Sequence, residues 1–262
     1  MLNEKENCKF YSGLPDKSVF DVMLKHIATR LEKPKKEFKK INQEEKFLIV
    51  LMKIRLNLKN KLLADIFDVS EGFISKLFLR WMPHVAKTFS YLIEWPTKQS
   101  VNTQKPTNQE AQTLVFSSYK NNQTNKFLVA IAPNGSIIFI SDAWGGHSSD
   151  KEITLKSGLL KLLKPYDVVL ADKGFLVQDE LIKMKVKFVM PSFKSSESQL
   201  TSAEVMHSQN VSNLRIHVER VIGPIRNFKM LNDIVITRSF KTINYIVQTC
   251  CGIVNLNPPI VH

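Results

Sequence analysis

The chain falls into two stretches that differ in the spacing of their hydrophobic residues. Up to residue 96 the apolar positions recur every three or four residues, as they do on one face of a helix. From residue 114 onward, short runs such as KFLVAIA and SIIFIS dominate, bounded by turn-forming residues. A polar tract rich in Gln, Asn and Thr, residues 97–113, separates the two stretches. The pattern predicts a helical region followed by an α/β region.

The most informative pattern in the first stretch covers residues 43–82. After a helix with an apolar face, residues 60–67 predict a short second helix, and Asp68-Val69-Ser70 predicts a tight break. A new helix should begin at Glu71, because Ser70 is a good N-cap and Asp68 tolerates the left-handed conformation. Two short helices across a three-residue turn are typical of a helix-turn-helix, although an ordinary helical hairpin has the same spacing.

The second helix of this pair is expected to present a polar outer face. Ile74 and Leu77, together with Val69 of the turn, are expected to point into the core, so the opposite side carries Glu71, Gly72, Ser75, Lys76 and Arg80. A face of this kind can enter the major groove of DNA. We therefore predict Ser75, Lys76 and Arg80 as DNA-binding residues.

The second stretch predicts alternating strands and helices. Strands are expected at 114–120, 126–132, 136–141, 167–171 and 186–191, and helices at 151–163, 177–185, 211–229 and 240–255. Pro133-Asn134-Gly135 predicts a hairpin turn, and Ser149 with Glu152 has the spacing of a capping box. Gly223-Pro224 should kink or split the third helix. The order predicts most of a mixed sheet with helices on its faces.

Charge favours a polyanionic partner. The formal net charge is +13, with a sequence pI of about 9.6. Residues 1–100 contribute +7, residues 101–180 are neutral and residues 181–262 contribute +6. This surplus favours nucleic acid over mere solubility. The basic run at residues 30–40 is either a solvated hinge or a segment for phosphate contact or nuclear import.

Composition excludes several other classes. The cysteines Cys8, Cys250 and Cys251 are too few and too irregularly spaced to predict a disulfide framework or a zinc site, which favours a reducing compartment. The first ten residues lack the apolar region of a secretory signal. No apolar run is long enough to span a membrane, so no membrane partner is expected.

Two carboxylates stand out as candidates for chemistry. Asp172 directly follows the predicted strand 167–171, at the strand end where α/β sheets hold their sites. Glu219 lies in the predicted helix 211–229, next to a core position, where a carboxylate needs a partner or a metal. The simpler readings are a turn cap for Asp172 and an ion pair with Arg215 for Glu219.

The other titratable residues nearby are weaker candidates. His217 lies about 200° around the helix from Glu219, so the two are not expected to bind one ion together. We interpret His217 as structural or substrate-facing. Asp142 and Asp150 flank the Gly145-Gly146 loop. A strand-ending turn explains Asp142, and a helix start explains Asp150.

Three runs together resemble a known family. They are FSSYKNNQTNKFLVAIAPNGSIIFISDAWGGHSSDKEITLKSGLL, DVVLADKGF and LRIHVERVIGPIRNF. With the helix-turn-helix before them, they resemble the DDE superfamily endonucleases of Harbinger-like transposases. The resemblance implies an N-terminal segment and basic linker at 1–40, an all-α helix-turn-helix domain at 41–96, and a ribonuclease-H-like mixed sheet flanked by helices at 97–262.

The resemblance also implies a function. Asp172 matches the second and Glu219 the third of three carboxylates that bind two divalent cations, Mg²⁺ or Mn²⁺. Two such ions activate a water molecule and stabilise the leaving oxygen when a phosphodiester is hydrolysed. The expected protein is a metal-dependent DNA endonuclease, a hydrolase located in the nucleus. Its expected partners are double-stranded DNA and a second copy of the chain.

The chain departs from the family at the first aspartate. That residue belongs on a strand after Trp95-Pro96, but no aspartate occurs between Asp68 and Asp142. The strand is therefore expected to be missing, which would leave the hairpin and strand 167–171 with unpaired edges. Residues 114–120 could shift into the gap, but they carry no carboxylate. The alternative function is thus a DNA-binding relic that cannot cleave, and a third is a basic protein-binding scaffold.

Overall fold

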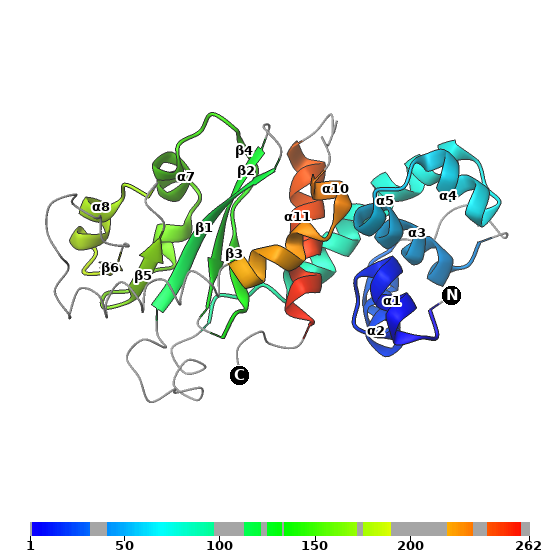
Figure 1. The fold of residues 1–262 in the computed structure, drawn as a ribbon, viewed down its shortest axis with the longest axis horizontal. Coiled ribbons are helices and arrows are strands. Elements are labelled where there is room, and N and C mark those ends of the chain that lie inside the picture. Colours follow the sequence, from blue (N-terminus) through cyan, green and yellow to red (C-terminus); the bar gives the residue numbers. More distant parts are fainter. Residues whose placement is uncertain are drawn as a thin grey trace, which may run out of the picture. The chain divides into compact units, whose positions relative to one another are not determined.

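The chain forms two compact units in a computed structural model (Figure 1). The structure describes residues 2–31, 41–96, 113–121, 125–132, 134–171, 175–189, 219–232 and 240–257. The first unit joins Met1–Leu92 to Pro224–Pro258, and the second joins Ile93–Gly223 to Pro259–His262. This grouping differs from the division expected at residues 40 and 96. The N-terminal and C-terminal helices both join the helix-turn-helix.

The first unit is helical. Its helices are α1 (Lys5–Ser12), α2 (Lys17–Ala28), α3 (Gln43–Leu56), α4 (Asn60–Phe67), α5 (Glu71–Ser90), α10 (Lys229–Asn232) and α11 (Phe240–Asn255). Helix α3 was expected to bury one face, but every residue from Phe47 to Met52 is buried. The reason is its central place, because α1, α2, α5 and α10 all pack against it.

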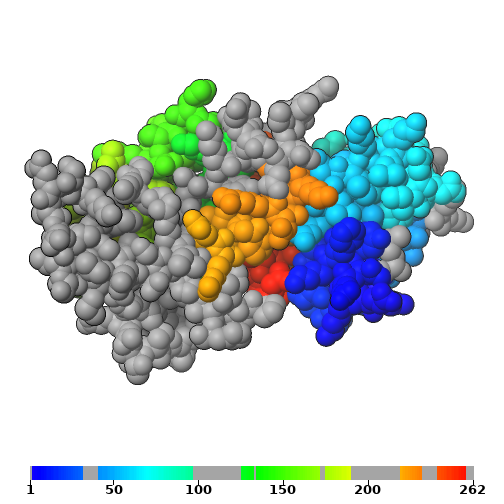
Figure 2. All heavy atoms as spheres, viewed as in Figure 1, coloured from blue at the N-terminus to red at the C-terminus, as the bar shows by residue number. Residues whose placement is uncertain are grey.

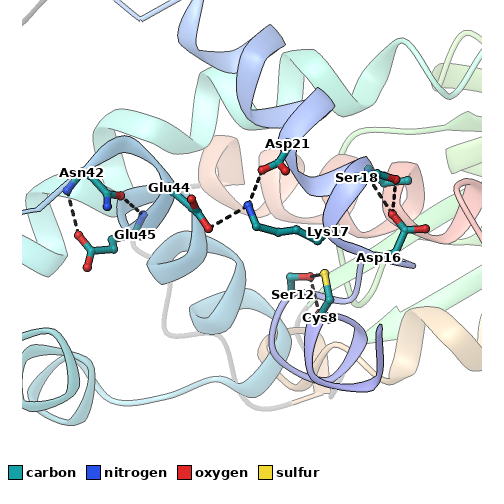
Figure 3. A network of polar contacts seen from close by, with 10 residues as sticks. Cys8, Ser12, Asp16, Lys17, Ser18, Asp21, Asn42, Glu44 and Glu45 are labelled. Carbon is teal, nitrogen blue, oxygen red and sulfur yellow. Dashed lines mark hydrogen bonds and ion pairs between the residues drawn. The ribbon is translucent and has the colours of Figure 1, made fainter. Parts of the chain in front are cut away.

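Side-chain contacts fix the start of α3 (Figure 3). Asn42 Oδ1 accepts from the backbone N–H of Glu45 at 2.8 Å, and Glu45 Oε2 accepts from that of Asn42 at 2.9 Å. Together these bonds form a capping box that satisfies two N–H groups at the helix start. Lys17 of α2 pairs with Asp21 and, at 2.9 Å, with Glu44 of α3. These pairs are partly exposed, so their main effect is to orient the helix start.

Helix α11 crosses α5 at close range. A Cβ atom on Gly252 would lie 2.6 Å from the carbonyl oxygen of Phe89, so only glycine permits this approach. Next to the crossing, Asn255 Nδ2 donates to the carbonyl oxygen of Leu92 at 2.8 Å. The inward positions of α11, including Ile246 and Ile253, are fully buried. The C-terminal helix is therefore part of the helical core of the first unit.

The second unit contains a mixed sheet. Its strands are β1 (Thr113–Asn121), β2 (Asn125–Ile131), β3 (Ile137–Ile140), β4 (Trp144–Gly145), β5 (Val168–Ala171) and β6 (Lys187–Val189). The strand order is β3-β2-β1-β5-β6, with β4 paired to β2. β1 runs antiparallel to β2, which is antiparallel to β3, and β1, β5 and β6 are mutually parallel in this order. A mixed sheet after a helical region agrees with the predicted fold class.

Short helices accompany this sheet. They are α7 (Asp150–Lys156), the 3₁₀ helix η2 (Leu159–Lys161) and α8 (Gln178–Lys183). The core beside them includes Leu128, Ile153, Leu159, Val169, Phe175 and Leu181. None of the helices in the described part of the chain is both long enough and apolar enough to cross a membrane.

The expected gap in the sheet is closed. On one side of β1, Val115 is level with Ile131 of β2, and on the other side it is level with Leu170 of β5. The expectation that the hairpin and strand 167–171 would keep unpaired edges is therefore wrong. Unpaired backbone groups are costly, and the nearest strand-forming segment, residues 113–121, takes the central position.

Local signals in the second unit were partly correct. The hairpin turn forms as predicted, with Gly135 at a φ of 85°. Ser149 Oγ accepts from the N–H of Glu152, but the Glu152 carboxylate pairs with Lys156 at 2.7 Å, so only half of the capping box forms. The helix expected to continue to Pro165 ends at Lys156 instead. Gly158, with a φ of 87°, redirects the chain there.

One of the two outcomes predicted at Gly223-Pro224, a split helix, is wrong. Residues 219–226 are helical without interruption, so Gly223-Pro224 does not split this segment. Val221, Ile222 and Ile225 are buried, which agrees with an inward apolar face. The earlier part of the predicted helix, residues 211–218, lies outside the described residues.

Candidate functional site

The turn between α4 and α5 has the predicted geometry. Asp68 adopts the left-handed conformation, with φ 51° and ψ 54°. Ser70 Oγ accepts from the N–H of Phe73 at 3.2 Å and so caps α5. Ala64, only 4% exposed, lies on the buried side of α4, where a small residue lets the two helices approach closely. With α4 packed against α5, the tight turn and the N-cap are the features of a helix-turn-helix.

Lys53 ties this pair of helices to α3. Its Nζ donates to Asn60 Oδ1 at 2.7 Å and to the carbonyl oxygen of Leu58 at 3.3 Å. The ammonium group also lies 5.8 Å from the ring centre of Phe78 in α5. Burial lowers the pKa of Lys53, because the charged form loses solvation there. One side chain thereby links α3, α4 and α5.

The outer face of α5 is exposed. Ile74 and Leu77 are buried as predicted, whereas Val69 in the turn is half-buried and does not reach the core. The predicted DNA-binding residues Ser75, Lys76 and Arg80 are all exposed. Cyan, the colour of α4 and of the first part of α5, covers part of the surface in Figure 2.

Sequence reasoning missed one residue of this face. Leu79 is 61% exposed and lies four residues after Ser75, on the same side of α5. Only polar residues and glycine were predicted for the outer face, so this leucine was left out. Its spacing from Ser75 and Lys76 was the signal that could have placed it.

The two candidate carboxylates are not equally visible. Asp172 lies outside the described residues, directly after β5 in the chain. Glu219 begins the described helical segment 219–226, and its side chain is exposed. Glu219 lies one turn before the buried Ile222, and Val218, the core position expected beside it, lies outside the described residues. His217 and Arg215 lie outside the described residues.

The helical segment touches a defined end of the sheet. Gly135, in the turn between β2 and β3, lies beside Val221. A Cβ atom added at Gly135 would lie 3.8 Å from Cγ2 of Val221. Ile131, the last residue of β2, is level with Val115 of β1, which is level with Leu170 of β5. Because β2 runs antiparallel to β1 and β5, the turn that follows Ile131 lies toward the start of β5. Asp172 follows the opposite end of β5. The pairing of Asp172 with Glu219 stays a prediction.

Other carboxylates near the sheet have structural surroundings. Asp150 Oδ1 pairs with Lys126 of β2 at 3.3 Å, and both side chains are less than one-fifth exposed. Lys126 Nζ also donates to the carbonyl oxygen of Ser148 at 3.0 Å, which holds the loop before α7 against β2. Asp142 is exposed and follows β3, two strands from β1.

The described residues do not gather a metal-binding set. Among them no three His, Cys, Asp or Glu side chains lie close enough to hold an ion. β1 has the central position in the sheet, but its residues, TLVFSSYKN, include no aspartate or glutamate. Magnesium prefers about six oxygen ligands. The carboxylates described here therefore do not by themselves fit a two-cation site.

A helix-turn-helix followed in the chain by a mixed sheet with helices is consistent with a helix-turn-helix segment before a ribonuclease-H-like domain. The family model of the DDE superfamily endonuclease matches residues 99–255. The model for the helix-turn-helix of DDE superfamily endonuclease matches residues 39–90. Since the first match covers more than half of the chain, the chain belongs to the DDE superfamily endonuclease family. No curated protein matches it.

Proposed function

We propose that this chain is a transposase-derived protein that binds duplex DNA through α5. The observation that carries the proposal is the exposed face of α5, which includes Ser75, Lys76 and Arg80. Helix α5 is the second helix of the helix-turn-helix. A second helix of this kind can enter the major groove, with cations at the phosphates and short polar side chains at the bases. The charge of +7 over residues 1–100 supports the same partner.

The experiment is a binding titration at two salt concentrations. Phosphate contacts release counterions, so affinity for duplex DNA should fall steeply as salt rises. Lys76→Ala/Arg80→Ala should weaken binding and reduce the salt dependence by about one counterion for each phosphate that the variant no longer neutralises. Lys161→Ala/Lys164→Ala, in the second unit, removes the same charge and serves as the control. If the affinity does not change with salt, or if both double variants weaken binding equally, the outer face of α5 is not the DNA-binding surface.

A second candidate function is metal-dependent cleavage of DNA. The match of residues 99–255 to the DDE superfamily endonuclease favours it. Against it stands the composition of β1, which lies beside β5 and brings no carboxylate to the central strand. Asp172 and Glu219 alone would supply few of the oxygen ligands that Mg²⁺ or Mn²⁺ requires. We therefore propose that this chain cleaves DNA poorly or not at all.

A nicking assay separates the two functions. Supercoiled DNA is incubated with Mg²⁺ or Mn²⁺ and with the wild type, Asp172→Ala or Glu219→Gln. We expect the same background for all three proteins. The positive control is the chain with an aspartate-bearing strand of the family inserted after Val101. Metal-dependent nicking by the wild type that Asp172→Ala abolishes would establish the endonuclease instead.

Location in the nucleus belongs to the same proposal. The basic run at residues 30–40 has the composition of an import segment, and all but its first two residues lie outside the described part of the chain. Replacing its five lysines by glutamine in a fluorescent fusion should shift the protein toward the cytoplasm. A distribution that does not change would remove this segment from the proposal.

A further inference from the structure

The outward face of α5 has an apolar centre, and this inference rests on the proposed binding of DNA by that face. At about 100° per residue, Gly72 lies only about 20° around the helix from Leu79. Ser75 lies about 40° to one side of Leu79, and Lys76 about 60° to the other. Arg80 is a further 40° or so beyond Lys76. Both cations therefore lie on one side of a line formed by a glycine and a leucine, and Ser75 lies on the other side.

Neither residue on this line is required by the fold. Leu79 is 61% exposed, so it contributes little to the core. Gly72 does not adopt a positive φ, and nothing lies within 4 Å of the place where its Cβ would be. Alanine would suit this helical position better than glycine. A bare first turn does, however, let the helix approach another surface closely.

In a major groove the middle of the helix face meets base edges, and the flanks meet the phosphates. A leucine side chain offers no hydrogen bond, so the one base feature that it can recognise there is the methyl group of thymine. We propose that Leu79 is a specificity-determining residue that contacts thymine methyl groups. Gly72 keeps the helix close enough for this contact, while Lys76 and Arg80 hold the neighbouring phosphates.

The test uses DNA that lacks only the methyl group. Preferred duplexes are first selected from a random pool with the wild-type chain, and each thymine is then replaced in turn by deoxyuridine. For the wild type, affinity should fall roughly threefold to fivefold at one or two thymines, as expected for one apolar carbon. Leu79→Ala should bind the thymine and deoxyuridine duplexes equally and keep the wild-type salt dependence.

Leu176→Ala is the matched control, because Leu176 is a 66% exposed leucine in the second unit. This variant should keep the full sensitivity to deoxyuridine. A selected pool without base preference, or a sensitivity that Leu79→Ala retains, overturns the inference about Leu79. If salt-dependent binding and the effect of Lys76→Ala/Arg80→Ala persist in that case, the proposed function stands. If neither the wild type nor any variant binds DNA, both proposals are wrong.

Discussion

At the scale of single residues, two helical glycines have opposite meanings. Gly72 in α5 is surrounded by open space, whereas Gly252 in α11 would place a Cβ 2.6 Å from the carbonyl oxygen of Phe89. Helix propensity alone treats both positions alike, because glycine costs about 1 kcal/mol relative to alanine in a helix. The difference comes entirely from the packing of α11 on α5.

We predict that alanine changes the stability of the first unit in opposite directions at these two glycines. Gly72→Ala should raise the free energy of unfolding by about 0.5–1 kcal/mol through helix propensity. Gly252→Ala should lower it by about 1–3 kcal/mol, since the added methyl group must push the two helices apart. Urea denaturation followed by circular dichroism measures both. Stabilisation by Gly252→Ala would mean that α11 does not cross α5 at this distance.

At the scale of elements, β1 decides whether the second unit has a continuous sheet. Residue Val115 is level with a residue of β2 on one side and with a residue of β5 on the other. A central strand cannot lose a backbone donor without leaving a neighbour unpaired, so proline is poorly tolerated there. The continuity of this sheet therefore depends on a segment whose sequence alternates only weakly.

We predict that Val115→Pro disrupts the pairing of both neighbouring strands. Each buried backbone group left without a partner costs about 1–3 kcal/mol. Amide hydrogen exchange should show reduced protection in β2 and β5. Glu71→Pro is the control, because Glu71 is the first residue of α5 and follows Ser70 with φ −83° and ψ 151°, a conformation that proline accepts. Unchanged protection of β5 in Val115→Pro would place β1 elsewhere.

At the scale of the whole molecule, the helical unit is built from both ends of the chain. Besides the crossing at Gly252, Arg55 of α3 lies 5.0 Å from the ring centre of Phe228, just before α10. All three cysteines, Cys8, Cys250 and Cys251, are buried in this unit. Burial raises the pKa of all three thiols, so they should resist thiol reagents while the unit stays folded.

We predict that residues 1–96 do not form a stable domain by themselves. Removing α11 would expose Phe89, which Gly252 of α11 contacts, and each buried large side chain contributes about 1.5–3 kcal/mol. A chimera that joins residues 1–92 to 224–258 through a flexible linker should fold cooperatively and protect its cysteines from a thiol reagent. A cooperative melting transition for residues 1–96 alone would contradict the described composition of the unit.

The sequence by itself determined the elements whose signals are local. Helix α4 has the predicted ends, α11 has the predicted span, and Asp68 and Ser70 act as predicted at the turn between α4 and α5. A cap, a left-handed turn residue and a helical period each depend on neighbours within a few positions, so they can be read from the chain. The absence of an aspartate before Asp142 is likewise a property of the sequence alone.

The tertiary structure decided which elements meet. Residues 113–121 became the central strand because they pair with β2 on one side and with β5 on the other. Both partners come later in the chain, so the local sequence of residues 113–121 does not specify them. The close crossing at Gly252 brought α11 into the helical unit, and exposure placed Leu79 on the outer face of α5. Burial and strand pairing depend on contacts between distant residues, and local periodicity carries no information about those partners.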